Sequence, residues 1–81
     1  MNEDTEELIM RLIRLKEVMD QTALSRSAVY RKMNEGSFPQ SVSLGDRAVA
    51  WVESEVQDWI AQRIAHHARE FKGYNAEHSY F

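Results

Sequence analysis

The sequence predicts a small, mainly α-helical domain with three helices and one β-hairpin. Three observations predict it: two short amphipathic segments separated by a few residues, an alternating apolar segment that turns back on itself, and a long amphipathic segment near the end. With 81 residues the chain has room for one domain. We place that domain at residues 11–68, between an acidic N-terminus (1–10) and a C-terminal tail (69–81).

The first two helices are expected to form a helix-turn-helix. One apolar face runs through Leu15, Val18, Met19 and Thr22, at the i, i+3, i+4 and i+7 spacing of a helix. The stretch before it is ambiguous, because Leu8, Ile9, Leu12 and Ile13 also fit a helical stripe, but we favour a short strand near Leu12–Arg14. Ser25 is a good N-cap for a second helix that runs from Arg26 to Asn34 or Glu35, and Gly36 can close that helix in the left-handed conformation. Two short helices joined by a few residues are typical of this motif.

A hairpin is predicted directly after the second helix. Pro39 favours an extended conformation at the preceding residue, and apolar and polar residues then alternate. A two-residue turn at Gly45-Asp46 would place Leu44 opposite Arg47 and Val42 opposite Val49, with Trp51 further along the same side. Arg47 would then lie at the hairpin tip. A hairpin in this position is called a wing, so the predicted fold class is a winged helix-turn-helix.

The third helix is predicted to begin near Val52 or Glu53 and to end near Phe71. Its apolar stripe consists of Val56, Trp59, Ile60 and Ile64. Trp51 and Trp59 could stack on bases, but their positions at a strand end and on a helix stripe favour the core.

A helical wheel divides the second helix into two faces. Arg26, Ser27, Tyr30, Arg31 and Asn34 fill one sector, whereas Ala28, Val29 and Met33 fill the other. The first set suits DNA, because Arg can bind guanine or phosphate, Asn can pair with adenine, and hydroxyl groups can donate to phosphate. The same set would also fit an ordinary exposed helix face. Lys32 interrupts the apolar face, and we expect its aliphatic part to lie along the core edge.

The charge distribution supports a polyanion partner despite an acidic total of −3. Residues 1–10 carry −4, residues 11–50 carry +3 and residues 51–81 carry −2. The basic segment contains the second helix and the hairpin, and the local field governs binding.

Several classes of function are not expected. The chain has no cysteine, no apolar run long enough to span a membrane and an acidic start unlike a signal peptide, so we expect a cytoplasmic protein. His66 and Glu70 have ligand-like spacing, but a third ligand is not evident, so no metal or other cofactor is expected. No phosphate-binding loop or catalytic constellation can be recognised, so we expect neither an enzyme nor a small-molecule site.

The order of motifs resembles the AlpA family of prophage regulators, which have a MerR-like winged-helix fold. The matching features are "RL" before the first helix, "T-x-L-S-R-S-x-x-Y-R" across the turn, "G-x-FP", "LG-x-R" in the wing, "V-A-W" and "E-V-x-x-W-I". The resemblance covers roughly residues 11 to 64. Lys32 departs from the family pattern, because many relatives have an apolar residue there.

The resemblance implies a sequence-specific transcription regulator that binds double-stranded DNA. Its second helix would enter the major groove through Ser25, Arg26, Ser27, Tyr30 and Arg31, with Asn34 added from the wheel, and Arg47 would contact DNA from the wing. Some family members look like excisionases, which is a second interpretation. A third is a protein-interaction module without DNA binding. The aromatic residues of the tail, Phe71, Tyr74, Tyr80 and Phe81, fit either a surface for another copy or another protein or a tail without fixed structure.

Overall fold

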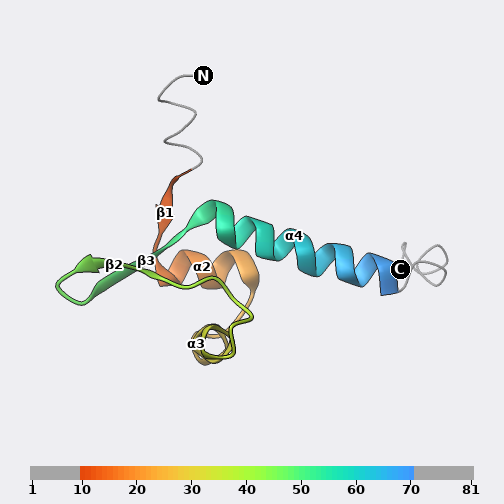
Figure 1. Cartoon of the computed structure of the whole chain (residues 1–81), viewed down its shortest axis with the longest axis horizontal. Coiled ribbons are helices and arrows are strands. Elements are labelled where there is room, and N and C mark those ends of the chain that lie inside the picture. Colours follow the sequence, from red (N-terminus) through yellow and green to blue (C-terminus); the bar gives the residue numbers. More distant parts are fainter. Residues whose placement is uncertain (1–9, 71–81) are drawn as a thin grey trace, which may run out of the picture.

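Three helices and a three-stranded antiparallel sheet make up the fold (Figure 1). The computed structural model describes residues 10–70 of the chain. The predicted class, mainly helical with a small β wing, is confirmed, and each predicted element is present. In chain order these are β1 (Leu12–Ile13), α2 (Leu15–Thr22), α3 (Arg26–Asn34), β2 (Val42–Gly45), β3 (Ala48–Val52) and α4 (Glu53–Glu70).

Local hydrogen bonds fix the turn between α2 and α3. Ala23 takes the left-handed conformation (φ 64°) and its amide donates to the carbonyl of Met19. Ser25 caps α3, because its hydroxyl oxygen accepts a hydrogen bond of 3.2 Å from the Ala28 amide. Gly36 closes the helix region with φ 78°. The predicted N-cap and the left-handed glycine are therefore both confirmed.

The sheet has the strand order β1-β3-β2, so β3 lies in the middle. Trp51 of β3 is paired with Ile13 of β1, and both side chains are buried on the face that meets the helices. The strand β1, which precedes the first helix, therefore pairs with β3, and β3 leads directly into α4.

The predicted register of the hairpin is wrong by one residue on one strand. The turn residues are Asp46 and Arg47, Gly45 pairs with Ala48, and the register shifts between Ser43 and Gly45. Because of this irregularity, Val49 faces Ser43, whereas Val42 faces Ala50. Val42 and Leu44 therefore do not share the buried side with Val49 and Trp51, and both are exposed.

The core forms where α2, α3, α4 and the sheet meet. Its fully or nearly buried members are Ile13, Val18, Val29, Phe38, Trp51 and Val56. Trp51 has an exposed fraction of 0%, and Trp59 packs against the same cluster while its indole N–H donates to the Ser37 carbonyl at 2.7 Å. The predicted core role of both tryptophans is confirmed.

Helix α4 extends past the body of the domain (Figure 1). Val56, at the end of its first turn, is buried, and Ile60 still packs against the core. Ile64 was expected to continue this buried stripe, but its side chain is 63% exposed, because the body ends before the helix does. None of the helices within residues 10–70 is long and apolar enough to cross a membrane.

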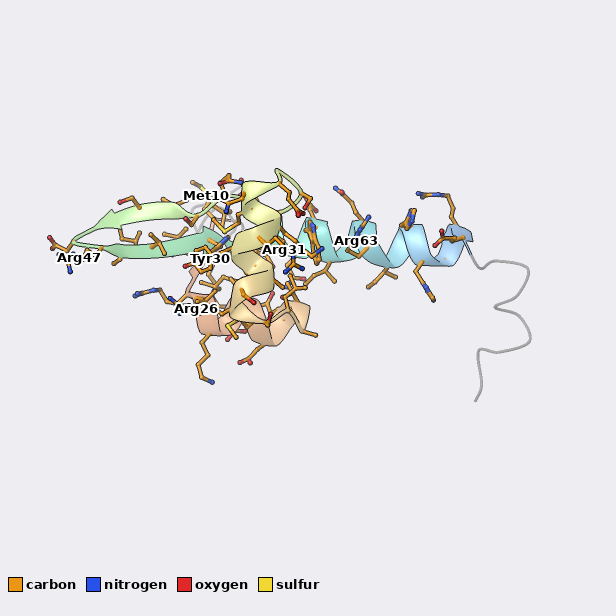
Figure 2. All side chains as sticks on the ribbon, turned by 90° about the horizontal axis from the view of Figure 1, so that it is seen from below. Met10, Arg26, Tyr30, Arg31, Arg47 and Arg63 are labelled. Atoms are coloured by element: carbon orange, nitrogen blue, oxygen red, sulfur yellow. The ribbon has the colours of Figure 1, made fainter. Side chains whose placement is uncertain are left out.

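Helix α3 forms a ridge on one side of the molecule. Figure 1 shows it end-on at the bottom, with the β2–β3 hairpin reaching to one side and α4 to the other. Seen from below in Figure 2, α3 crosses the middle of the face, between the hairpin and α4. The molecule therefore presents one protruding helix with a flanking element on each side.

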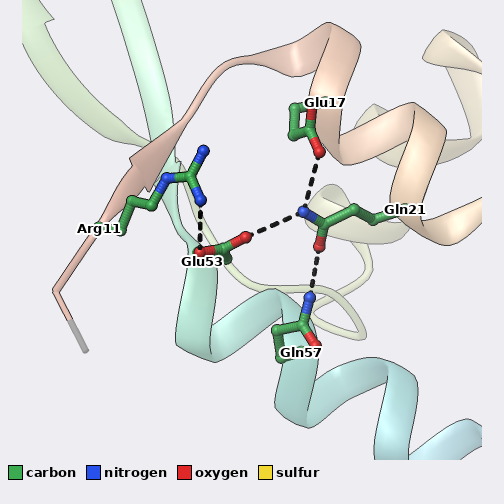
Figure 3. A network of polar contacts seen from close by, with 5 residues as sticks. All are labelled: Arg11, Glu17, Gln21, Glu53 and Gln57. Carbon is green, nitrogen blue, oxygen red and sulfur yellow. Dashed lines mark hydrogen bonds and ion pairs between the residues drawn. The ribbon is translucent and has the colours of Figure 1, made fainter. Parts of the chain in front are cut away.

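A polar network fixes the start of α4 against α2 and β1 (Figure 3). The Gln21 amide donates to Glu53 at 3.0 Å and to Glu17 at 3.1 Å, and Gln57 donates to Gln21 at 2.7 Å. Arg11 lies 3.6 Å from the Glu53 carboxylate, and the Glu53 amide donates to the Arg11 carbonyl at 2.7 Å. These contacts set the direction in which α4 leaves the body.

Some predictions concern the ends of the chain. Residues 1–9 of the acidic N-terminus and the aromatic residues of the tail, Phe71, Tyr74, Tyr80 and Phe81, lie outside the described residues.

Candidate nucleic-acid interface

The outer side of α3 carries most of the side chains predicted to contact DNA. Ser25, Arg26, Ser27, Arg31 and Asn34 are all exposed. The opposite side carries Val29, which is completely buried. The helix keeps its polar sector outward because the packing of Val29, Tyr30 and Met33 against the core fixes its rotation.

Tyr30 lies at the edge between the two faces of α3. Its side chain is half-buried, and its ring meets the Trp51 ring edge-on, with 6.3 Å between the centroids. The Arg26 guanidinium lies 5.7 Å from the Tyr30 centroid, within the range of a cation–π contact. Tyr30 thus orients Arg26 while it packs against the core.

Lys32 is half-buried, in agreement with the expectation that its aliphatic part lies along the core edge. Arg31, its neighbour, is exposed and lies on the face shown in Figure 2. The two adjacent cations therefore have different surroundings.

Arg47 lies at the tip of the hairpin, as expected (Figure 2). The one-residue change of register makes it the second residue of the turn, where it takes φ 67° after Asp46 with φ 49°. This backbone conformation holds an exposed guanidinium at the point of the hairpin farthest from the core.

The arginines of this face are not neutralised by nearby acids. Within residues 10–70, no carboxylate lies within ion-pair distance of Arg26, Arg31 or Arg47. The same part of the chain contains nine Lys/Arg and eight Asp/Glu, a net charge of +1. An anion that approaches the ridge and the hairpin tip therefore meets unpaired positive charge.

Comparison with known proteins places the chain in a family. Residues 11–64 match the family described as Prophage CP4-57 regulatory protein (AlpA). The chain belongs to the AlpA family. It is similar to the uncharacterized protein ORF88 of Enterobacteria phage P4, with 48% identity over 66 residues that cover 82% of this chain and 72% of that protein. It is also similar to the DNA-binding transcriptional activator AlpA of Escherichia coli K12, with 32% identity over 60 residues that cover 67% of this chain and 86% of the relative.

The histidines of this AlpA-family chain give little indication of a metal site in the described part. His66 Nε2 lies 3.7 Å from the Glu70 carboxylate, which makes an ion pair when His66 is protonated. In the stretch from Met10 to Glu70, there is no group of three or more His, Cys, Asp or Glu side chains that could hold a metal ion.

One candidate contact of the AlpA-family chain was missed by sequence reasoning. An open groove lies between the segment after α3 and the first half of α4, and Arg63 is at its lining together with Trp59 and Phe38. Arg63 is not among the residues that the sequence pattern assigns to DNA contacts. The signal that could have drawn attention to it is the i, i+4 spacing from Trp59 to Arg63.

Proposed function

We propose that this protein is a sequence-specific, DNA-binding transcription regulator of prophage type. Helix α3 would enter the major groove, and the β2–β3 hairpin would contact the neighbouring backbone. The observation that carries the proposal is the protruding helix α3, whose exposed Arg26 and Arg31 have no acidic partner in residues 10–70. The E. coli relative named a DNA-binding transcriptional activator supports the same class of function.

The dimensions and chemistry of α3 suit the groove. A helix with its side chains is about 10–12 Å wide, and the major groove of B-DNA is about 12 Å wide. Arg31 and Asn34 are the candidates for base contacts, since Arg can pair with guanine and Asn with adenine. Arg26 and the hydroxyl groups of Ser25, Ser27 and Tyr30 are assigned to phosphate, and Arg47 to the backbone beside the hairpin.

In the proposed function the protein binds DNA without making or breaking covalent bonds. The family description likewise indicates a regulator rather than an enzyme. A module of this size offers few contacts, so useful affinity calls for several copies on adjacent sites.

The first prediction concerns Arg31. In Arg31→Ala, we expect the loss of one bidentate base contact, about 1–3 kcal/mol or roughly 5- to 150-fold in affinity for the specific site. The measurement is footprinting and titration on DNA around the protein's own gene, with the fold checked by circular dichroism. Lys32→Ala is the matched control, because it removes the same charge from the half-buried neighbouring position.

An Arg31→Ala footprint identical to that of the wild type would contradict the assignment of α3 as the reading helix. Binding should also weaken steeply with salt, since phosphate contacts release counterions.

Protection of a promoter would indicate a transcription regulator, whereas protection and bending of a phage attachment site would indicate an excisionase. Absence of DNA binding, together with a stable protein partner, would favour an interaction module.

A further inference from the structure

The hairpin and α4 flank α3 on opposite sides of the proposed DNA-facing surface. In Figure 1, α3 lies lowest, and both the hairpin and α4 are set back from it. Figure 2 shows Arg47 and Arg63 on the two flanks, with Arg31 between them. When a helix fills the major groove, one phosphate backbone lies on each side of it. The hairpin meets one of these backbones, and α4 is in position for the other.

Arg63 is on the side of α4 that faces the DNA-proximal part of the molecule. It follows the fully buried Val56 by seven residues, and residues seven apart lie on one face of a helix. Val56 points into the body, from which α3 protrudes. Arg63 points the same way, but it lies at the level where α4 leaves the body, so its side chain is exposed.

Arg63 contacts Trp59 of its own helix, and Trp59 in turn contacts the segment that follows α3. Its guanidinium carbon lies 5.8 Å from the Trp59 ring centroid. Trp59 in turn donates a hydrogen bond of 2.7 Å to the Ser37 carbonyl and meets the Phe38 ring at a centroid distance of 4.9 Å. Through Trp59, the Arg63 side chain is thus held relative to the segment after α3. Part of the conformational entropy that Arg63 would lose on binding is therefore already lost in the free protein.

The charge of Arg63 is available for an anion. Glu55 and Asp58 line the same groove, yet no carboxylate in the described part of the chain lies within ion-pair distance of Arg63. Glu70, the acid further along α4, is in contact with His66 instead. A guanidinium that is oriented, exposed and unpaired is suited to a phosphate oxygen.

We infer that Arg63 binds a DNA phosphate on the backbone opposite to the one that the hairpin contacts. This contact rests on the proposed function, because it requires α3 in the major groove. Together, Arg47 and Arg63 grip the two edges of the groove that α3 fills. Such contacts fix register and orientation and carry no sequence information of their own.

The test compares Arg63→Gln with Arg69→Gln. Both remove one positive charge from α4, but Arg69 follows Val56 by thirteen residues and so lies roughly 140° around the helix from it, away from the DNA-facing side. The probes are a duplex that contains the site protected by the wild type and an unrelated duplex of equal length. Affinity is titrated from low to high salt, and phosphate ethylation interference locates the contacted phosphates.

For Arg63→Gln we expect the slope of log K against log salt to fall in magnitude by about 0.9, and binding to weaken roughly five- to tenfold at 0.1 M salt on both duplexes. Interference at one phosphate, on the flank away from the hairpin, should disappear. Arg63→Lys should restore the slope, and Arg69→Gln should keep both slope and interference pattern.

Two results would overturn the Arg63 contact alone. One is an Arg63→Gln protein with the salt slope and interference pattern of the wild type. The other is an equal loss of DNA affinity in Arg69→Gln, which would mean that only the net charge matters. A wild-type protein without a specific footprint would overturn the proposed function itself, and the contact with it.

Discussion

The Ser25 hydroxyl group has a role in α3 that does not depend on DNA. Its oxygen accepts a hydrogen bond from the Ala28 amide at 3.2 Å and lies 3.4 Å from the Ser27 hydroxyl. A hydroxyl group has one proton and two lone pairs, so Ser25 can cap the helix and still donate to a phosphate. Its structural role and its proposed binding role can therefore be separated by substitution.

We predict that Ser25→Ala lowers the free energy of unfolding by about 1 kcal/mol, the usual cost of a lost N-cap. Urea unfolding measures this directly, and Ser27→Ala should change it little, because Ser27 caps nothing. Ser25→Asp should keep the cap but weaken DNA binding, since its carboxylate repels phosphate. If Ser25→Ala unfolds at the same urea concentration as the wild type, the cap does not contribute to stability.

The sequence predicted single residues well where the cause is local. The cap at Ser25 and the left-handed Gly36 depend on a few neighbours, and the wheel placed the exposed Arg26 and Arg31 correctly. It could not predict that Tyr30 is half-buried, because that follows from the Trp51 ring, which comes from a distant strand. The DNA contacts themselves remain a prediction.

At the scale of elements, the hairpin turn combines a cation with an uncommon backbone conformation. Asp46 and Arg47 both have positive φ, at 49° and 67°, in a turn type where Asn-Gly and Asp-Gly are preferred. The left-handed conformation costs a residue with a side chain roughly 1–2 kcal/mol. A cationic residue in a strained position at the tip of a proposed wing is consistent with a binding role for its side chain.

We predict that Arg47→Gly separates stability from binding. Glycine removes the strain, so the free energy of unfolding should stay the same or rise by about 0.5–1 kcal/mol, while DNA affinity falls because the wing loses its cation. Asp46→Gly is the control, since it relieves strain at the neighbouring residue and keeps Arg47. Thermal unfolding and DNA titration measure the two effects, and an Arg47→Gly protein that binds DNA like the wild type would exclude Arg47 from the interface.

Two errors of prediction at this scale have physical causes. Alternation of apolar residues predicts a hairpin, but not the irregularity between Ser43 and Gly45, which shifts the pairing of β2 with β3 by one residue. As a result, Val42 lies on the opposite face of the sheet from the one that the alternation predicts. Helical spacing likewise predicts that Ile64 lies on an apolar stripe, but not that the body has ended by then. Periodicity gives the type and face of an element, whereas its partners are set by the rest of the chain.

At the scale of the whole molecule, the acidic total comes from one end of the chain. Residues 1–9 contain four acids and no base, residues 10–70 carry a net +1, and residues 71–81 contain one base and one acid. Charges beyond about 10 Å are screened at 0.1 M salt. The acidic end therefore opposes DNA binding only as far as its field reaches the interface.

We predict that neutralising the acidic end strengthens DNA binding at low salt. The variant changes the net charge from −3 to +1 without shortening the chain and combines Glu3→Gln, Asp4→Asn, Glu6→Gln and Glu7→Gln. Because the effect is long-range and not tied to a base, affinity should rise about equally for specific and unrelated duplexes, and the gain should fade as the Debye length shrinks to about 3 Å at 1 M salt. The control replaces the three glutamates by aspartate and so keeps the charge. Equal affinities of the neutralised and control proteins at low salt would mean that the acidic end does not act on the interface, and the basic ridge alone would then set the electrostatics of binding.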